Sequence, residues 1–586
     1  MFLATTANQN FWKTDEPILF LGEWCRIYSQ KHIWRKLEHE VLPYYGLNRA
    51  GLYQDYLYSM KLYERLLTQL AAQLNELHDS KQSVRYWRVI LGPWLASFIG
   101  IFLDRYRSLR VAVDSGKVTN TWISPEFPEE YLANDFSEFR DNSFEDGYNH
   151  CLFSQIIKSS EGIPWEAIKN GDALTSEPRL IKPFQKSGIK RALIRLLGTC
   201  SKLIPDSFGE MVAIQTYIKP MDLMKLQLSM KMLPCPYRPQ VDVVYSEANW
   251  DLRENIKLRK GENHFESILI ESIRFHFPKI YLEGYSNMVQ KARDTYPKYP
   301  KVILTSNAYK MDEGFKFWAA DQVSRGVKLG ITQHGGHVGD GLWSIDDDHE
   351  IDIANRYYSW GWTRENESKV MPMSSSMLGA MKDCIPDPKG TILCVPCSSP
   401  RYPYQMFSSP QGPLILEEIK FQKNFLKEVS PTVLSLLVFR LYGEGGWEEK
   451  MRWQNSSISP KVYQGNMPYR DHLATSRVCV CFYNGTPFLE TFAANYPTIL
   501  CWDPRYTELN NLAQPYFKML REAGILYDSP ESAASKLNEI YQDPNSWWAS
   551  PKIQDVKNKF CDRFASTSND WLAQWKRELT KLAFEE

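Results

Sequence analysis

Two short segments carry the residue types that could do chemistry in this chain, Leu329–His337 and Phe482–Glu490. Each begins as an apolar strand, continues into glycine or other small residues, and then presents polar side chains. Open α/β sheets hold their ligands in this way, at the carboxyl ends of parallel strands. Because there are two such segments, we expect two facing domains, each with its own sheet.

The second segment predicts an anion site at the start of a helix. Thr486 has the chemistry of an N-cap and Pro487 that of the first helical position, so the next backbone N–H groups, just after Gly485, are offered to a phosphate. Glu490 stands four residues after Thr486, one position later than the residue that closes a capping box. Its carboxylate is therefore available to accept from the ribose hydroxyls of a nucleotide, although a solvated helix glutamate is the alternative.

The first segment places His334 in a turn flanked by glycines, where a ligand can approach the backbone closely. A histidine there can donate to phosphate or carboxylate, or act as a base toward an acceptor hydroxyl. Many strand-end histidines are structural, but the neighbouring Gln333, Gly335 and Gly336 favour a functional one. His337 could join His334 as a metal pair, yet no third ligand is evident in the sequence.

Three further strand ends carry candidates. Arg440 ends the apolar run at residues 436–439, where it could clamp a phosphate, and a structural ion pair is the alternative. Glu23 follows the short strand at residues 17–22 and is our choice as general base, although an ion pair with Arg26 would be as economical. The weaker candidates, which common turn chemistry could also explain, follow the strand at residues 391–396: Ser398, Ser399 and Arg401.

Metal motifs are weak, and we expect no metal or other cofactor. Asp346–Asp348 contains a DxD spacing, but it reads as a solvated polar loop. Cys394 and Cys397 form a CxxC inside an apolar strand, with no second pair at zinc spacing. We therefore expect both cysteines to be reduced and metal-free.

The elements that must position these residues follow a strand–loop–helix rhythm from residue 300 onward. This rhythm is typical of parallel, doubly wound α/β sheets. Before residue 300 the spacing is mainly helical. The expected strands lie at residues 301–306, 327–332, 356–360, 391–396, 436–441, 478–483 and 498–502.

The connection between the two sheets should lie between Trp362 and Pro388, where long apolar runs are missing. We therefore expect an N-terminal, acceptor-side domain over residues 1–370 and a donor-binding domain over residues 385–555. Residues 556–586 should form a C-terminal helix that packs back on the first domain. The longest apolar run, Val89–Leu103, has 15 residues and contains Gly92 and Pro93, so a buried helix is expected there rather than a membrane span.

Composition limits the class of protein. The 586 residues hold 69 basic and 69 acidic side chains, so no overall field draws the chain to nucleic acid. The 11 scattered cysteines suit a reducing compartment, and the start at Met1 has no basic region followed by an apolar run. A cytoplasmic protein is expected, with peripheral docking on the inner face of the membrane as an option.

A resemblance to a known family extends over nearly the whole chain. The residues that carry it are Leu3–Thr6, Gly22–Cys25, Tyr86–Trp94, Gln333–Gly336, Tyr357–Trp362 and Gly485–Thr498. In these residues the chain resembles a family of transferases found in bacterial surface-polysaccharide, O-antigen and flagellar glycosylation gene clusters. The pairing of an HG turn with a later Thr-xxx-Glu helix start more distantly resembles capsule-type glycosyltransferases and the polyol-phosphate transferases of teichoic-acid synthesis.

The resemblance implies a GT-B fold, in which two Rossmann-like domains face a cleft and the C-terminal domain holds the nucleotide of the donor. It further implies a CMP-activated nonulosonic acid, of the sialic, legionaminic or pseudaminic type, or the related Kdo. The acceptor would be a surface glycan, a lipid-linked glycan or a protein. Two alternatives stay open: a polyol-phosphate transferase with a CDP-activated donor, and a non-catalytic protein that binds a sugar nucleotide within an assembly complex.

Overall fold

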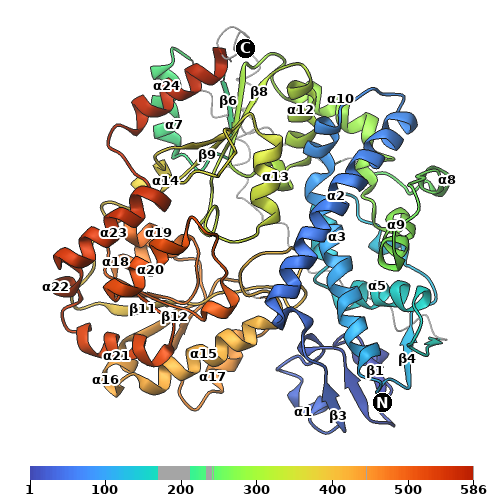
Figure 1. Cartoon of the computed structure of the whole chain (residues 1–586), viewed down its shortest axis with the longest axis horizontal. Helices are drawn as coiled ribbons and strands as arrows, with labels where there is room; N and C mark the ends of the chain where they lie inside the picture. The colour runs from blue at the N-terminus through green and yellow to red at the C-terminus, as the bar shows by residue number, and fades with distance from the viewer. Residues whose placement is uncertain (169–210, 233–240, 242, 244, 444, 585–586) are drawn as a thin grey trace. The chain divides into compact units, whose positions relative to one another are not determined.

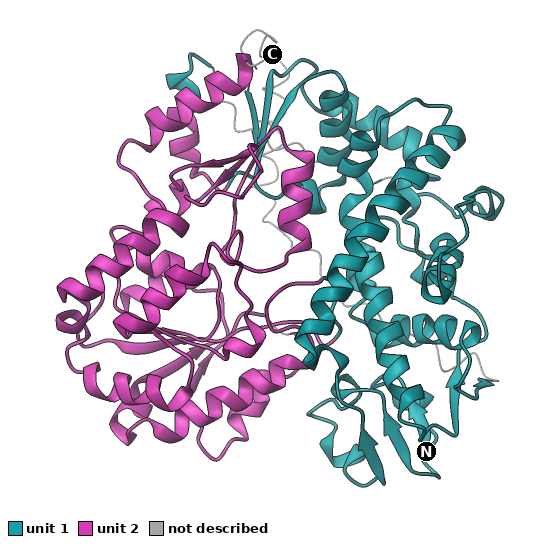
Figure 2. Cartoon of the chain, viewed as in Figure 1, with its two compact units in different colours: residues 1–216, 227–330, 402–405 teal, residues 217–226, 331–401, 406–586 magenta. Residues whose placement is uncertain are grey.

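The computed structural model describes residues 1–168, 211–232, 241, 243, 245–443 and 445–584. The chain divides into two compact units, which Figure 2 shows in teal and magenta. Unit 1 comprises residues 1–216, 227–330 and 402–405, and unit 2 comprises residues 217–226, 331–401 and 406–586. The division falls inside strand β8 (Lys328–Thr332).

Unit 1 begins with a parallel sheet of order β3-β2-β1-β4-β5. Its first two strands are fully apolar and buried, which suits a sheet that is covered on both faces. The sequence analysis predicted only its second strand, so this sheet is one more than the two expected. The strands are β1 (Phe2–Ala4), β2 (Ile18–Phe20), β3 (His39–Val41), β4 (Asn120–Ile123) and β5 (Glu166–Ala167).

Two long helices of unit 1 lie side by side, α2 (Arg49–Leu77) and α3 (Val84–Asp114) (Figure 1). Ser83 caps α3 by accepting from the backbone N–H of Tyr86 at 3.2 Å. By length and composition α3 is the one helix in the described part of the chain that could cross a membrane, but 94% of its apolar window is buried inside the protein. The expected buried helix is confirmed.

The other helices of unit 1 pack around this pair or lie at its edges. They are α1 (Lys31–Trp34), α4 (Phe136–Asn142), α5 (Asp146–Ser159), α8 (Trp250–Glu254), α9 (His264–His276), α10 (Tyr285–Thr295), α11 (Ala308–Met311) and α12 (Glu313–Ser324). A further helix, α7 (Pro220–Ser229), is divided between the two units.

A second five-stranded sheet has the order β10-β9-β8-β7-β6. The pairs β6–β7 and β9–β10 are parallel. The strands are β6 (Met211–Ile214), β7 (Val302–Thr305), β8, β9 (Arg356–Ser359) and β10 (Val370–Pro372). The three strands predicted in this part of the chain are confirmed.

Unit 2 holds the third sheet, whose order β13-β12-β11-β14-β15-β16 is the strand order of the Rossmann fold. All of its pairs are parallel, and β11, β14 and β15 are almost entirely buried. The four strands predicted here are confirmed, as is the α/β class with parallel sheets. The strands are β11 (Thr391–Val395), β12 (Leu437–Arg440), β13 (Lys461–Tyr463), β14 (Ser476–Cys481), β15 (Thr498–Cys501) and β16 (Leu526–Tyr527).

The helices of unit 2 include two near the C-terminus where one was expected. The last of them, α24 (Trp571–Phe584), packs on β9 through Trp575 and Tyr358, and Trp575 also donates to the backbone oxygen of Ser374 at 3.0 Å. The others are α13 (Ile345–Ile353), α14 (Ser376–Gly379), α15 (Leu414–Glu428), α16 (Pro431–Leu436), α17 (Glu449–Gln454), α18 (Tyr469–Ala474), α19 (Thr486–Ala493), α20 (Gln514–Ala523), α21 (Pro530–Ile540), α22 (Pro544–Trp548) and α23 (Pro551–Phe564).

The expected domain boundary between residues 370 and 385 falls between β10 and β11, where one sheet ends and the next begins. The division into compact units lies earlier, inside β8. The predicted domain bounds stay a prediction.

Candidate functional site

The candidate residues of unit 2 follow the carboxyl ends of four strands: β11, β12 and β14, which lie in unit 2, and β8, which is divided between the units. In a Rossmann sheet the strand order reverses beside the first strand, and ligands bind outside the carboxyl ends there. In the third sheet this point lies between β11 and β14. The predicted anion site, at Gly485 and Thr486, directly follows β14.

Gln333 fixes the shape of the turn after β8. Its side-chain oxygen accepts from the backbone N–H of Trp360 and from the indole N–H of Trp362, each at 2.8 Å. Its amide nitrogen donates to the backbone oxygen of Gly335 at 2.8 Å. Gln333 is 3% exposed, so it positions the turn through protein contacts rather than presenting a group to a ligand.

Gly336 lies directly against the start of α19. Its backbone N–H donates to the hydroxyl oxygen of Thr486 at 2.8 Å. A Cβ at Gly336 would meet the carbonyl carbon of Gly485 at 2.4 Å, whereas a Cβ at Gly335 would meet nothing closer than 3.5 Å. The two predicted segments therefore touch through backbone, and glycine is required at the second of the two positions.

The N-cap of α19 is Gly485, one residue earlier than predicted, with extended backbone at φ −168° and ψ −175°. Thr486 cannot cap the helix because it is the first helical residue and its hydroxyl is used by Gly336. Pro487 follows as the second helical residue and has no N–H to offer. The prediction of a helix start at this point is confirmed, but the role given to Thr486 was wrong.

His334 lies beside a buried carboxylate that the sequence analysis missed. Its Nδ1 is 3.6 Å from Oε1 of Glu350, which is close enough for an ion pair and longer than a hydrogen bond. The His334 side chain is 28% exposed and that of Glu350 is 1% exposed. Tyr217, also in unit 2, stacks on the imidazole with ring centroids 6.1 Å apart. An accessible imidazole oriented by a buried carboxylate is a known arrangement for a general base.

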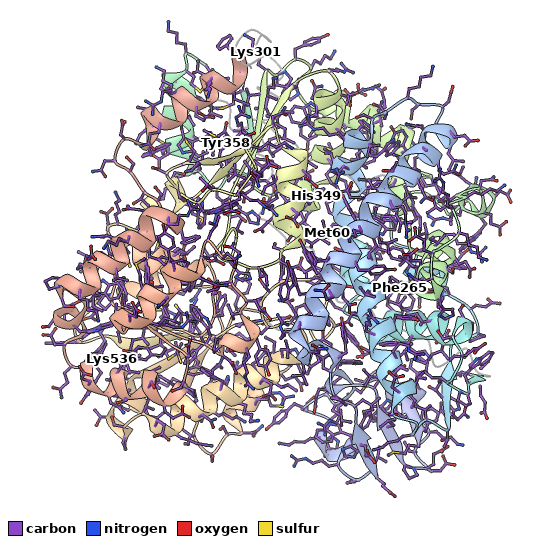
Figure 3. All side chains as sticks on the ribbon, viewed as in Figure 1. Met60, Phe265, Lys301, His349, Tyr358 and Lys536 are labelled. Carbon is purple, nitrogen blue, oxygen red and sulfur yellow. The ribbon has the colours of Figure 1, made fainter. Side chains whose placement is uncertain are left out.

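Glu350 comes from α13, the helix that follows the turn after β8. The same helix carries His349, and Figure 3 labels this residue together with Tyr358 of β9. The sequence signal for Glu350 was weak, because Glu350 is one of five acidic residues between positions 346 and 352 and nothing local distinguishes it from the others.

His337 has polar protein groups around both ring nitrogens. Its Nε2 is 3.1 Å from the Ser408 hydroxyl, and its Nδ1 is 3.2 Å from Asp340 and 3.0 Å from the Asn484 amide nitrogen. Burial lowers the pKa of His337, but the hydrogen bond and charge of Asp340, with Asp347 and Glu508, raise it above its ordinary value. Its backbone has a positive φ of 64°. His337 thus connects the turn after β8 to Asn484, which follows β14, and both of its ring nitrogens have polar protein groups beside them.

The acidic run Asp346–Asp348 forms the first turn of α13 instead of the expected loop. Asp347 accepts from the Ser344 hydroxyl at 2.7 Å and from the Gly339 N–H at 3.0 Å, and burial raises its pKa to about 7. Asp348 pairs with Arg364 at 2.5 Å. Ser344 caps α13 by accepting from the backbone N–H of Asp347, and among the described residues no group of three or more possible metal ligands occurs.

Arg440 ends β12 as predicted, and its charge is not neutralised by an acidic neighbour. Its guanidinium donates to the backbone oxygen of Met467 at 2.7 Å and lies 3.2 Å from Nδ1 of His472. It also lies over the rings of Tyr463 and Tyr469, at 5.5 and 5.9 Å. Within the described chain no carboxylate forms an ion pair with it, so the structural ion pair weighed as the alternative is not formed.

Glu490 lies in the second turn of α19 and is largely buried. Burial raises its pKa to about 7. Burial, with a contribution from the charge of Glu490, raises the pKa of Tyr469 and Tyr483, which places Glu490 near both rings. The ribose role of Glu490 stays a prediction, and the capping-box argument fails because the cap is Gly485.

The three candidate residues in the loop after β11 have different surroundings. Ser399 is 3% exposed, donates to Gln411 at 3.3 Å and accepts from the N–H of Gly412, so it is structural. The backbone N–H of Arg401 donates to Gly445 at 2.8 Å, which fixes the loop. Ser398 is the member that lines a cavity.

Glu23 lies in unit 1, in a short 3-10 helix directly after β2. Its carboxylate pairs with Arg26 at 2.5 Å, the alternative that the sequence analysis weighed. The catalytic assignment of Glu23 stays a prediction.

Comparisons with known proteins give a family and distant structural likenesses. No curated protein matches the sequence. Wall teichoic acid polymerase TagF, solved with CDPG, is similar with 10% identity and a TM-score of 0.29 over 68% of this chain and 98% of that one. HepE from Anabaena, solved with UDP and glucose, is similar with 11% identity and a TM-score of 0.34 over 64% of this chain and 98% of that one.

At these TM-scores the two structures carry no argument about this chain. The family comparison is far more extensive, because the model of the LIC12162 family transferases matches residues 1–579. The protein is therefore a member of the LIC12162 family of transferases.

Proposed function

We propose that this transferase is a GT-B glycosyltransferase that moves a nonulosonic acid from its CMP ester to a bacterial surface glycan, a lipid-linked glycan or a protein. The observation that carries the proposal is the junction of the turn after β8 with the start of α19. It joins an accessible imidazole, His334, to the carboxyl edge of a Rossmann sheet. A base and a phosphate site are the two components that glycosyl transfer from a nucleotide sugar requires.

In the proposed reaction the acceptor hydroxyl oxygen forms a bond to the anomeric carbon of the sugar. The bond from that carbon to the phosphate oxygen breaks, and CMP leaves with the electron pair. His334 or Glu23 takes the hydroxyl proton. Arg440 and the N–H groups at the start of α19 stabilise the charge on the departing phosphate, since cationic and N–H donors are most effective where charge develops.

No metal is required in this proposal, because a monophosphate donor leaves less charge to offset than a diphosphate and Arg440 is available to offset it. The protein would act in the cytoplasm, with peripheral association at the inner face of the membrane. The proposal covers pseudaminic, legionaminic and sialic acids and Kdo alike, because all of them are donated from a CMP ester.

The test begins with a thermal-shift panel of CMP, CDP, UDP and GDP on the full-length protein. A ligand that binds the folded state at 100 times its Kd stabilises it by about 2.7 kcal/mol, so CMP should raise the melting temperature most. Transfer from a CMP-nonulosonic acid is then measured with and without EDTA, and should persist with it.

Each alternative has its own outcome. Transfer of a polyol phosphate from a CDP donor, with no sugar transfer, would identify a phosphotransferase. The absence of a shift with every nucleotide would favour the non-catalytic assembly protein.

A further inference from the structure

A small cavity, with about 10 Å³ of space for a water-sized group, opens at the carboxyl ends of β11 and β12, beside α15 in unit 2. Ile419 and Trp453 form apolar walls, and Tyr442 at the rim is 85% exposed. Of the candidate residues considered above, Cys397 and Ser398 line it. The mouth is therefore an exposed aromatic ring above a largely apolar pocket.

The wall of the cavity contains a buried acceptor without a donor. Gln422 lines the cavity and is 1% exposed, and its side-chain oxygen has no hydrogen-bond partner in the described part of the chain. Glu418, one turn earlier on α15, is also 1% exposed, and neither of its oxygens has a partner there. A buried acceptor without a donor is costly, so the Gln422 oxygen calls for a ligand that supplies an N–H group.

The charges around the cavity indicate the same kind of ligand. Burial, followed by the charges of Asp503 and Glu417, raises the pKa of Glu418 to about 8. Burial and then the carboxyls of Glu418 and Glu449 raise the pKa of the Cys397 thiol, which places both acids near the cavity wall. Such surroundings disfavour a phosphate or carboxylate and favour an uncharged group that donates hydrogen bonds.

The cavity lies one strand away from the predicted phosphate site. Phosphates in a Rossmann sheet lie at the switch point, here between β11 and β14, and the nucleoside extends toward the end of the second strand, here β12. A nucleotide whose phosphate lies at the start of α19 would therefore extend its nucleoside toward the cavity. A nucleobase reaching it would meet Tyr442 first and Gln422 at depth.

We propose that this cavity binds the amino-bearing edge of the nucleobase of the donor, cytosine. The Gln422 side-chain oxygen accepts from the exocyclic amino group, and the Tyr442 ring stacks on the base. Uracil presents an acceptor where cytosine presents this donor, so the site rejects it. The inference rests on the proposed function, because it takes the nucleotide of that donor as its ligand.

The test is calorimetric titration of the full-length protein with CMP, UMP, GMP and AMP. The wild type should bind CMP at least about 10-fold more tightly than UMP, the discrimination expected when a site built for an amino group meets an acceptor instead. Gln422→Met keeps the volume but removes the acceptor, and should lower this ratio to near one by weakening CMP. Tyr442→Ala should weaken CMP and UMP by similar factors.

Lys420→Met is the matched control, because Lys420 lies on the same helix with its side chain 72% exposed, and it should leave the ratio unchanged. The ratio of two affinities does not depend on the fraction of folded protein, so a destabilised variant is still informative. A CMP preference that survives Gln422→Met would overturn this inference and leave the proposed transfer standing. A wild type that prefers a purine nucleotide would contradict both the inference and the proposed CMP donor. A wild type that binds no nucleotide would overturn both.

Discussion

Substituting Gly336 with alanine should disrupt the junction between the turn after β8 and α19. The added Cβ would lie 2.4 Å from the Gly485 carbonyl carbon and 2.5 Å from the Thr486 nitrogen, where ordinary contact begins at 3.4 Å. The turn must therefore move by about 1 Å against helix backbone, which cannot rotate away as a side chain can. Overpacking of this size costs about 1–3 kcal/mol, and losing the hydrogen bond to Thr486 adds about 0.5–1.5 kcal/mol.

Gly335→Ala is the matched control. Its Cβ would meet the Thr486 hydroxyl at 3.5 Å, an ordinary contact, and neither glycine has a φ in the left-handed region. Alanine at such a position changes stability little, or raises it by about 0.4–1 kcal/mol through the unfolded state. The two neighbouring substitutions should therefore have opposite effects.

Urea unfolding followed by tryptophan fluorescence gives the two stabilities. Hydrogen exchange of the peptide that contains residues 333–340 then tests the junction itself, because the Gly336 amide should exchange faster in Gly336→Ala and in Thr486→Val. Equal stability and equal exchange in Gly335→Ala and Gly336→Ala would refute the contact on which the site is built.

Four further predictions concern the charged and reactive groups. Burial raises the pKa of Glu490 from 4.5 to about 7, so the folded state loses stability as the pH rises between these values. The Glu490→Gln variant should lack up to about 3 kcal/mol of this loss, and unfolding measured as a function of pH tests it. Glu490→Ala should also weaken CMP binding by about 1–3 kcal/mol, and unchanged affinity in a folded variant would remove Glu490 from the site. His334→Ala should lower sugar transfer at least about 100-fold with little change in CMP affinity. Glu23→Gln should do the same if Glu23 is the base. If one variant keeps full turnover, the substituted residue is structural. Cys394 and Cys397 should be reduced and metal-free, so zinc in chelator-free protein that disappears in Cys397→Ser would contradict the assignment.

Much of the fold could be predicted from local pattern. The strands of the last two sheets are nearly continuous apolar runs ended by glycine, proline or polar residues, because strands covered on both faces need no alternation. The first sheet was missed except for β2, since strands as short as Phe2–Ala4 give too few residues for a periodic signal. A helix start was predicted with Thr486 as its cap, one residue too late, because the cap depends on the partner of the Thr486 hydroxyl, which is the Gly336 N–H.

The sequence alone predicted which segments could carry chemistry, because glycine, histidine and helix-start residues after apolar strands have few other uses. Only the tertiary structure decided which contacts they make. It made Gln333 and His337 supports of the turn, placed Glu350 beside His334, and gave Arg440 no acidic partner among the described residues. The physical reason is that hydrogen bonds and ion pairs between residues far apart in the chain depend on packing, which local patterns do not encode.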